Sequence, residues 1–314
     1  MRLIHSLEDA QLTEESVVTI GSFDGVHRGH QSLIAGVRES AQEANRAAVV
    51  MTFFPHPSVV LGRAQPFYLT SPEEKLVQIN QTGADLLIEW PFTPETARLR
   101  AAEFIDQLVV HLHMRELWIG HDFALGYQRE GNAEFLARLG ETRGFTVKTV
   151  EPITNDNEVI SSSGIRAALH AGDVTHAARL LGRWFRLSGR VVPGDGRGRT
   201  IGIPTANLAV WPEHAVPGNG VYACRAWVGH IPHAAAVNIG TRPTVTDQTQ
   251  RTIEAHVLDF DKDLYGINVT LDFVEFLRSE QKFNGITELV AQIHKDVART
   301  RELLNELLIP QREA

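Results

Sequence analysis

Cysteine is almost absent from this sequence of 314 residues, in which Cys224 is the only one. A single thiol excludes an internal disulfide bond and a metal site built from several cysteines. Long apolar runs are also missing, since no segment approaches the eighteen or so uninterrupted apolar residues that a membrane helix needs. The first seven residues lack the apolar core of a secretion signal. We therefore expect a cytoplasmic protein with no membrane partner.

Positive charge is in short supply as well. Lys and Arg together number 30 against 38 Asp and Glu, so the formal net charge is −8. Sequence-independent nucleic-acid binding requires a basic face, and we expect no nucleic-acid partner. An anionic small substrate is not excluded, because a few local arginines can reverse the field in one cleft. The sequence leaves both a monomer and a homo-oligomer open.

The first half alternates short apolar runs with longer amphipathic stretches. Helical patterns begin near Gln31, Pro72, Pro94 and Asn132. Five apolar runs between them are typical of buried strands: Val17–Phe23, Ala47–Phe54, Ala84–Ile88, Leu117–Gly120 and Phe145–Val150. Strand alternating with helix predicts an α/β domain with a parallel sheet, whose ligands bind beyond the carboxyl ends of the strands.

The pattern changes after a helical stretch over Ser163–Leu181. Short alternating runs follow, separated by Gly and Pro: Arg186–Val192, Gly220–Trp227, His233–Asn238, Thr252–Leu258 and Asn268–Phe276. Such runs predict a small antiparallel barrel, and an amphipathic helix from Ile286 to about Leu308 is expected to pack across it. The boundary falls around Gly182–Trp184, which predicts domains over residues 1–182 and 183–314.

The first predicted strand runs directly into a glycine- and histidine-containing turn, Gly21-Ser22-Phe23-Asp24-Gly25-Val26-His27-Arg28-Gly29-His30. Free N–H groups at the start of the following helix attract phosphate oxygens. His27 and His30 can face the same phosphate, and Gly29 lets the backbone approach closely. The pattern alone is weak, because isolated histidines are more often surface or core residues. Its place after the first strand favours a phosphate-binding turn.

A second element, Ser161-Ser162-Ser163, comes before a predicted helix that carries Arg166. By itself it is better explained as an ordinary serine cap followed by a surface arginine.

The second half opens with a glycine-rich segment over Gly189–Arg199, which lacks the Gly-Lys-Ser/Thr ending of a Walker loop. Glycine loops with arginines can wrap phosphates through backbone N–H groups, although many are only flexible hairpins. Thr205 and Asn207 follow at a spacing of two, so on a strand they point to the same side. Their oxygens are hard ligands suited to Mg²⁺, and turn hydrogen bonds are the alternative explanation.

Taken together and in order, these elements resemble the bacterial bifunctional riboflavin kinase/FAD synthetases. In the first half the resemblance covers Gly21–His30, Thr52–Pro57, Ile119–Phe123 with Arg129 and Gly131, and Ser161–Arg166. In the second half it covers Pro204–Asn207, Gly220–Ala223, Asn238–Thr244, Glu254–Gly266, Phe276–Phe283 and Gln292–Asp296. The resemblance implies a Rossmann-like nucleotidyltransferase domain and a six-stranded antiparallel β-barrel riboflavin kinase domain with a C-terminal helix.

For the first domain the resemblance implies an FMN adenylyltransferase in which His27 and His30 bind the ATP phosphates during transfer. Further ATP contacts would come from Gly21, Phe23, Asp122, Ser162, Ser163 and Arg166, and flavin contacts from Phe54 and Pro57. FMN's phosphate is largely ionised at pH 7, so no general base is required. One departure is Ser163, where the family usually has threonine.

For the second domain the resemblance implies a riboflavin kinase that binds ATP through Gly194, Gly196, Gly198, Thr205 and Asn207. Thr205 and Asn207 would also hold Mg²⁺, and Arg278 would contact the flavin. An alcohol must lose its proton as it attacks, so a carboxylate base is needed. The resemblance assigns that role to Glu254. Ile203 and Val245 depart from the phenylalanines frequent in the family.

The resulting hypothesis is a bifunctional enzyme with riboflavin, FMN and ATP as substrates and Mg²⁺ as cofactor. Riboflavin and ATP would give FMN in the second domain, and FMN and ATP would give FAD and pyrophosphate in the first. Two alternatives stay open: an enzyme that retains one activity, and a non-catalytic flavin-binding sensor or carrier. The sensor would predict damage at His27, His30, Thr205, Asn207 or Glu254, and none is damaged.

Overall fold

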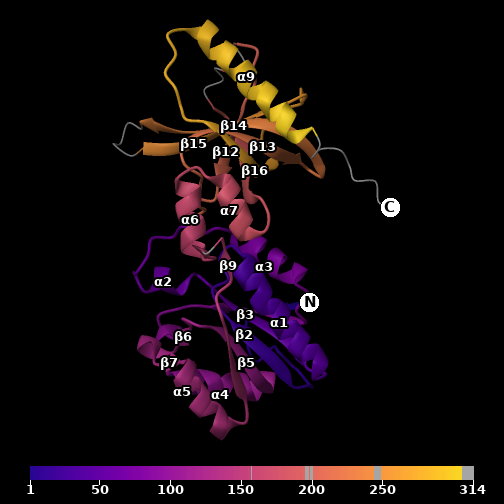
Figure 1. Ribbon diagram of the computed structural model, residues 1–314, viewed down its shortest axis with the longest axis vertical. Helices are drawn as coiled ribbons and strands as arrows, with labels where there is room; N and C mark the ends of the chain where they lie inside the picture. Colours follow the sequence, from indigo (N-terminus) through magenta and orange to yellow (C-terminus); the bar gives the residue numbers. More distant parts are fainter. Residues whose placement is uncertain (157, 195–197, 199–200, 244–248, 306–314) are drawn as a thin grey trace. The chain divides into compact units, whose positions relative to one another are not determined.

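A computed structural model describes the chain except for residues 157, 195–197, 199–200, 244–248 and 306–314. Residue contacts divide it into two compact units, Met1–Ser162 and Ser163–Ala314. Figure 1 shows the α/β elements of the first unit and the barrel of the second. Among the described helices, none is long and apolar enough to span a membrane.

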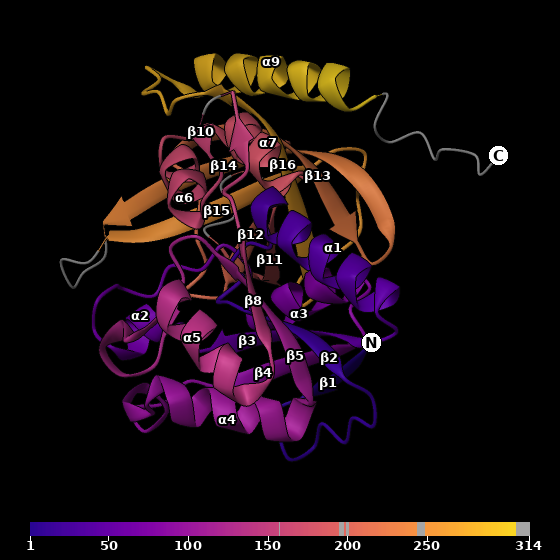
Figure 2. The same cartoon turned by 60° about the horizontal axis from the view of Figure 1, so that its bottom comes forward.

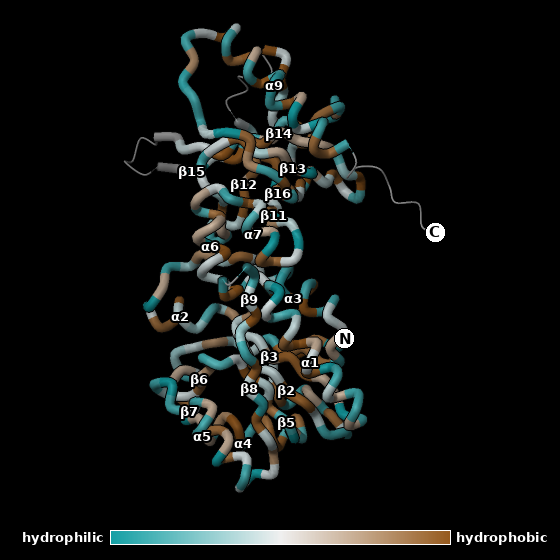
Figure 3. The backbone as a smooth tube through the Cα atoms, viewed as in Figure 1, coloured by the Kyte–Doolittle hydropathy of each residue, from teal (hydrophilic) through white to brown (hydrophobic). Residues whose placement is uncertain are grey.

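The first unit contains a six-stranded sheet in the order β1-β4-β3-β2-β5-β8, with every neighbouring pair parallel. The strands are β1 (Arg2–Ile4), β2 (Ser16–Ile20), β3 (Ala47–Phe54), β4 (Leu86–Pro91), β5 (Met114–Gly120) and β8 (Thr146–Val150). The predicted parallel sheet is confirmed, and β1 is a strand that the sequence pattern did not reveal. The central strands are coloured as hydrophobic in Figure 3, as expected for a sheet buried on both faces.

Helices cover both faces of this sheet, and alternate strand residues separate the two layers. Val18 and Ile20 of β2 share a core with α4 (Ala101–Leu112) and α5 (Ala133–Arg143). Val17, which precedes Val18, packs with α1 (Arg28–Glu43) on the opposite face. Figure 2 shows α4 and α1 on opposite sides of the sheet. This alternation follows from the two-residue period of a strand.

Shorter elements complete the first unit. Helix α3 (Pro72–Gln81) begins at the predicted residue because Ser71 and Glu74 form a capping box and Pro72 fits the first turn. The helix expected near Pro94 was wrong, since only a 3₁₀ turn lies there and α4 starts at Ala101. The rest are α2 (Pro57–Val60), η1 (Thr96–Arg98), η2 (Tyr127–Arg129), β6 (Ala124–Leu125), β7 (Gly131–Asn132), β9 (Thr154–Asn155) and β10 (Glu158–Val159).

The second unit is a closed antiparallel barrel preceded by two short helices. The expected helical stretch divides into α6 (Ser162–His170) and α7 (Val174–Leu181), with Gly172 at φ +81° between them. A left-handed backbone ends a helix, and glycine adopts it without strain.

The barrel order is β11-β12-β15-β14-β13-β16, so the expected six-stranded barrel is confirmed. Its strands are β11 (Phe185–Val192), β12 (Ala206–Val210), β13 (Gly220–Val228), β14 (Ile231–Pro243), β15 (Thr249–Val257) and β16 (Asn268–Arg278). Tyr222, Cys224 and Phe273 are buried. Burial also raises the pKa of the Cys224 thiol well above its usual range, so this cysteine is an inert core residue.

Helix α9 (Ile286–Leu304) lies against β13 and β14. Hydrophilic and hydrophobic residues alternate along it in Figure 3. Leu304 and the partly buried Val297 pack with Ala234 and Leu258 of the barrel. The expected helix over Ile286 to about Leu308 is therefore confirmed as far as Leu304, and its last expected turn extends past the described residues.

Candidate active sites

The turn between β2 and α1 places two histidines against each other at a helix N-terminus. His27 caps α1, and its Nδ1 accepts a hydrogen bond from the backbone N–H of His30 over 3.4 Å. The two rings stack with their centroids 3.6 Å apart and their planes 18° apart. Because Nδ1 of His27 is an acceptor here, the neutral ring carries its proton on Nε2, which can donate to an anion.

His30 is the more perturbed of the two imidazoles. The residue is partly exposed, yet its Nδ1 atom is buried and has no hydrogen-bond partner among the described residues. Burial lowers the pKa of His30 well below its usual range, and the neighbouring His27 lowers it further. His30 is therefore neutral at pH 7, and an anion arriving beside it would favour its protonated form.

The backbone of the same turn is strained. Phe23 and Val26 have φ angles of +48° and +37°, which side chains with a Cβ rarely adopt. The buried Phe23 ring lies edge-on to His30, with centroids 5.2 Å apart. A Cβ on Gly21 would come within 3.0 Å of that ring, so Gly21 leaves room for it. Strain of this kind clusters at binding sites.

Asp24 connects the turn to two other segments. Its buried carboxylate accepts a hydrogen bond from the backbone N–H of Leu69 over 2.9 Å. Its backbone carbonyl accepts one from the hydroxyl of Ser162 over 3.0 Å. The structure thus brings Ser162 of the serine-rich element to the histidine turn.

The remaining predicted ATP ligands are placed differently. Ser163 is exposed and Arg166 is half-buried, and both follow Ser162 in α6 as part of the second unit. The Asp122 side chain is 86% exposed and lies 4.0 Å from His121, and no described contact joins it to His27 or His30. Arg129 instead donates to the backbone carbonyl of Asp122 over 2.8 Å, which holds that loop in place.

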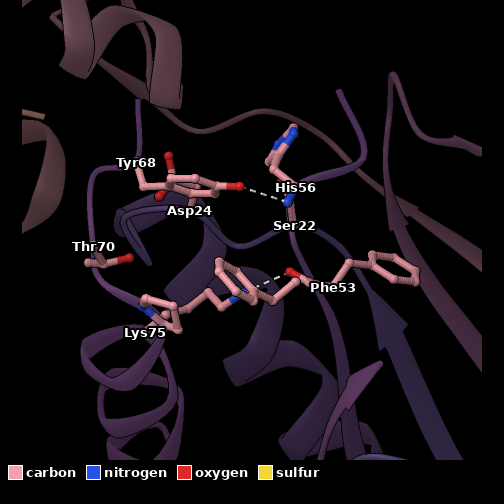
Figure 4. A pocket seen from close by; sticks show the side chains of 9 residues that line it. Ser22, Asp24, Phe53, His56, Tyr68, Thr70 and Lys75 are labelled. Carbon is pink, nitrogen blue, oxygen red and sulfur yellow. Dashed lines mark hydrogen bonds between the residues drawn. The ribbon is translucent and has the colours of Figure 1, made fainter. Parts of the chain in front are cut away.

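A small pocket of about 10 Å³ lies beside this turn at the carboxyl end of β3 (Figure 4). Phe54 and Tyr68 form its aromatic part, with ring centroids 5.9 Å apart. Pro57, the other predicted flavin contact, begins α2 and is not part of the lining. The lining residues are Ser22, Asp24, Phe53, Phe54, His56, Tyr68, Thr70, Pro72 and Lys75.

In the second unit, strand register places three polar residues in one row. Glu254 of β15 lies opposite Asn207 of β12 on one side and opposite Asn238 of β14 on the other. Directly opposed residues project from the same face of a sheet. The structure therefore brings together Asn207 and Glu254, which lie 47 positions apart in the sequence.

Two glycines of the glycine-rich segment pack closely on their neighbours, Gly194 on Asn207 of this row and Gly198 on Ile203 and Thr205. A Cβ on Gly194 would lie 2.1 Å from Nδ2 of Asn207, and one on Gly198 would lie 2.2 Å from the Ile203 carbonyl oxygen. The same Cβ on Gly198 would lie 3.3 Å from the Thr205 hydroxyl oxygen. Neither glycine can take a side chain without displacing its neighbour. The third predicted glycine, Gly196, lies outside the described residues.

A cavity of about 320 Å³ lies over the same face of the barrel. Thr205, Asn238 and Glu254 line it from the strands, and Leu289 and Ile293 line it from α9. Apolar walls with a few convergent polar groups are typical of small-molecule sites. A second cavity of about 80 Å³ also reaches Thr205 and is lined by residues that include Phe260, Lys262 and Tyr265.

Arg278, predicted to contact the flavin, lines the larger cavity and is paired inside it. Its guanidinium donates to both carboxylate oxygens of Asp296 on α9, over 2.8 to 3.1 Å. Gln292 donates to the same carboxylate over 2.9 Å. In this geometry Arg278 ties the end of β16 to α9 at the cavity wall.

Three lining residues were missed by the sequence-based reasoning. Tyr68 lies between recognisable elements, and Lys75 is on a helix where a lysine normally faces solvent. Asn238 was within a recognised segment, but only the register shows that it stands opposite Glu254. No local pattern reveals such a register in advance.

Comparison with known proteins connects both parts of the chain to flavin chemistry. The family model described as FAD synthetase matches residues 9–164, and the one described as Riboflavin kinase matches residues 181–304. The fold and the two sites therefore define a class of transferase with one synthetase half and one kinase half.

Full-length relatives join the two halves in one protein. Curated bifunctional riboflavin kinase/FMN adenylyltransferases from Bacillus subtilis and Escherichia coli K12 are each 40% identical to the chain over 305 residues. The matches cover 94% and 96% of this chain, respectively, and 96% of each relative. The chain belongs to the bifunctional riboflavin kinase/FMN adenylyltransferase family.

A crystal structure described as a macrolide-efflux protein from Streptococcus pneumoniae has the same fold. It superposes with a TM-score of 0.88 at 30% identity, covering 96% of this chain and 98% of that chain.

Proposed function

We propose that the histidine turn of the first unit and the row of polar residues in the second carry the two activities of this family. The chain is a riboflavin kinase and an FMN adenylyltransferase, and ATP is a substrate of both reactions. We assign adenylyl transfer to residues 1–182 and the kinase reaction to residues 183–314. The observation that carries the assignment is the position of Glu254, which lines one cavity together with Asn238 and lies opposite Asn207 in the barrel, because it gives the kinase a base beside a substrate-sized space.

In the kinase reaction the riboflavin alcohol attacks the γ-phosphate of ATP, and ADP leaves. We propose that Glu254 accepts the alcohol proton, since its carboxylate lines the 320 Å³ cavity. The flavin ring would occupy this cavity between the strands and α9. The smaller cavity, with Phe260 and Tyr265, is suited to the adenine base, and Thr205 lines both spaces. The transferred phosphoryl group would then pass beside Thr205.

Magnesium is a proposed cofactor of this site. Thr205 and Asn207 offer a hydroxyl and an amide oxygen, and hard oxygen donors of this kind fit Mg²⁺ bound with ATP. Gly194 and Gly198 pack against Asn207 and Thr205, so the phosphate-binding segment and the proposed metal ligands are adjacent. When bound, Mg²⁺ neutralises charge on the phosphates.

In adenylyl transfer an oxygen of the FMN phosphate attacks the α-phosphate of ATP, and pyrophosphate leaves. Both reactants are anionic, so the protein must position them and stabilise charge. We propose that His27 and His30 bind the ATP phosphates at the α1 N-terminus, with Gly21, Phe23 and Ser162 shaping the turn. Contacts from Asp122, Ser163 and Arg166 to ATP, and from Pro57 and Arg278 to flavin, remain predictions.

We propose that FMN binds with its ring against Phe54 and Tyr68, where the pocket of about 10 Å³ widens as the flavin enters. The pocket lies at the carboxyl end of β3, and Asp24 belongs both to its lining and to the histidine turn. Flavin and ATP would therefore meet at the turn. Consumption of ATP favours the cytoplasm as the site of action, and a homo-oligomer stays a prediction that light scattering would test.

Single substitutions test these assignments with separated flavin products as the measurement. Glu254→Gln should abolish FMN formation from riboflavin and leave FAD formation from supplied FMN intact. His30→Ala should do the reverse. Either variant retaining both activities would contradict the proposed roles, and loss of both activities by one substitution would contradict their separation.

A further inference from the structure

Lys75 is buried, although lysine is among the residues least often found inside proteins. Its side chain is 7% exposed, and no other lysine in the described part of the chain is buried. Its Nζ donates to the backbone carbonyl of Phe53 over 2.9 Å and lies 3.8 Å from Oε1 of Glu89. Lys75 thus joins α3 to the carboxyl ends of β3 and β4.

Burial of this ammonium is costly. It lowers the pKa of Lys75 from the ordinary value, while Glu89 and Asp24 act to raise it. A leucine or methionine would fill the same space without that cost, and apolar replacements of buried ion pairs are often neutral or stabilising. Stability alone therefore does not explain the charge.

The position of Lys75 suggests what it does. It lines the pocket assigned to the flavin ring, and two hydrogen bonds hold the backbone on either side of Phe54 (Figure 4). Lys75 holds the Phe53 carbonyl before it, and the Tyr68 hydroxyl accepts from the His56 N–H after it, over 3.0 Å. The aromatic wall of the pocket is thereby fixed at both ends.

We propose that Lys75 is a positioning residue for FMN, which holds the ends of β3 and β4 so that Phe54 is presented to the flavin ring. The inference rests on the proposed assignment of this pocket to FMN. Lys75 acts through the Phe53 carbonyl and the Glu89 carboxylate, so its effect falls on flavin binding and not on the transfer step.

Lys75→Met tests the proposal, because methionine keeps the apolar length and removes the charge. We expect the KM for FMN to rise about tenfold, because one charged hydrogen bond is lost. The kcat and the KM for ATP should stay within about twofold of the wild-type values. Lys75→Arg should recover part of the loss. The unchanged kcat and KM for ATP of adenylyl transfer report that the first unit is intact, and the riboflavin kinase activity of the second unit should not change.

The matched control is Lys148→Met, which removes an exposed lysine that lies over Trp118 and should leave the KM for FMN unchanged. If Lys75→Met does not fold, Glu89→Gln carries the test, since it removes the counter-charge and should also raise the KM for FMN. An unchanged KM for FMN, or a loss confined to kcat, would overturn the proposal. Failure of the wild-type chain to adenylylate FMN would instead overturn the proposed function.

Discussion

At the scale of single residues, the histidine turn holds the uncharged imidazole of His30 at the N-terminus of α1. His30 loses its ordinary affinity for protons because its ring is buried next to His27. Two neutral rings can stack at 3.6 Å, whereas two protonated ones would repel each other. Binding of the ATP phosphates would supply the negative charge that makes protonation favourable.

Acid should therefore destabilise the first unit through His30. The pKa of His30 is lowered in the folded state, so the unfolded state binds more protons once the pH falls below about 6.5, and stability declines there. Going from pH 7.5 to 5.5 should cost up to about 1.4 kcal/mol from this group. Denaturant unfolding of wild type and His30→Gln at both pH values measures it, and the variant should lose less stability. Equal losses would mean that His30 is not buried as described.

Gly194 makes a residue-scale prediction in the other unit. Its Cβ would overlap the Asn207 amide, so Gly194→Ala should displace a proposed ATP ligand and lower kinase kcat/KM about a hundredfold. FAD formation from FMN should be unaffected. Gly285→Ala is the control, because a Cβ there meets nothing within 4 Å. Normal kinase activity in Gly194→Ala would show that the glycine-rich segment has no role in the kinase reaction.

At the scale of elements, helix α9 packs against strands β13 and β14 of the barrel and also lines its larger cavity. Apolar contacts attach it near Leu304, and the Arg278–Asp296 pair attaches it beside the cavity. The side chains of this pair are only 15% and 7% exposed, so the pair is largely withdrawn from water.

Asp296→Ala should therefore destabilise the barrel by about 3 kcal/mol, because it leaves the Arg278 guanidinium buried without its partner. The KM for riboflavin should rise as α9 loosens. Glu302→Ala, which breaks an exposed pair with Arg299, should leave the stability nearly unchanged, because solvent screens that pair. Chemical denaturation and a steady-state kinase assay distinguish the two variants. Equal effects would show that the Arg278–Asp296 pair contributes no more to stability than an exposed pair does.

Elements with strong local signals could be predicted from the sequence. Helix α3 began where its cap and proline indicated, and the five apolar runs of the first half became strands. The start of helix α4 could not be predicted. Pro94 suggested a helix start, but the residues after it form a 3₁₀ turn. The break between α6 and α7 rests on a left-handed Gly172, and an isolated glycine within a helical pattern does not reveal its φ angle.

The sites were predictable to the extent that they are continuous in sequence. The histidine turn and the Thr205–Asn207 pair are local patterns, and the structure places the first at the start of α1 and the second at the start of β12. Tyr68, Lys75 and Asn238 join their sites through loop path, burial and strand register, which are tertiary properties. Local sequence carries little information about any of the three.

At the scale of the whole molecule, each unit has its own pocket and its own set of polar groups. Two variants that each lack one activity should therefore complement each other in solution. Glu254→Gln cannot make FMN and His30→Ala cannot use it, but a mixture should convert riboflavin into FAD once released FMN reaches the intact adenylyltransferase. Timed separation of the flavins would show FMN before FAD. A mixture that accumulates FMN without FAD would require transfer within one chain.

The row formed by Asn207, Glu254 and Asn238 also limits how this family can change over evolutionary time. A deletion of one residue within β15 would turn the carboxylate of Glu254 from the cavity into the barrel interior, because alternate strand residues face opposite sides. The closed barrel has no edge strand, so a shift in the register of β15 would disturb its pairing with both neighbouring strands. Changes in length should therefore be tolerated in turns, such as the Gly229–His230 connection between β13 and β14, while these three strands vary only by substitution.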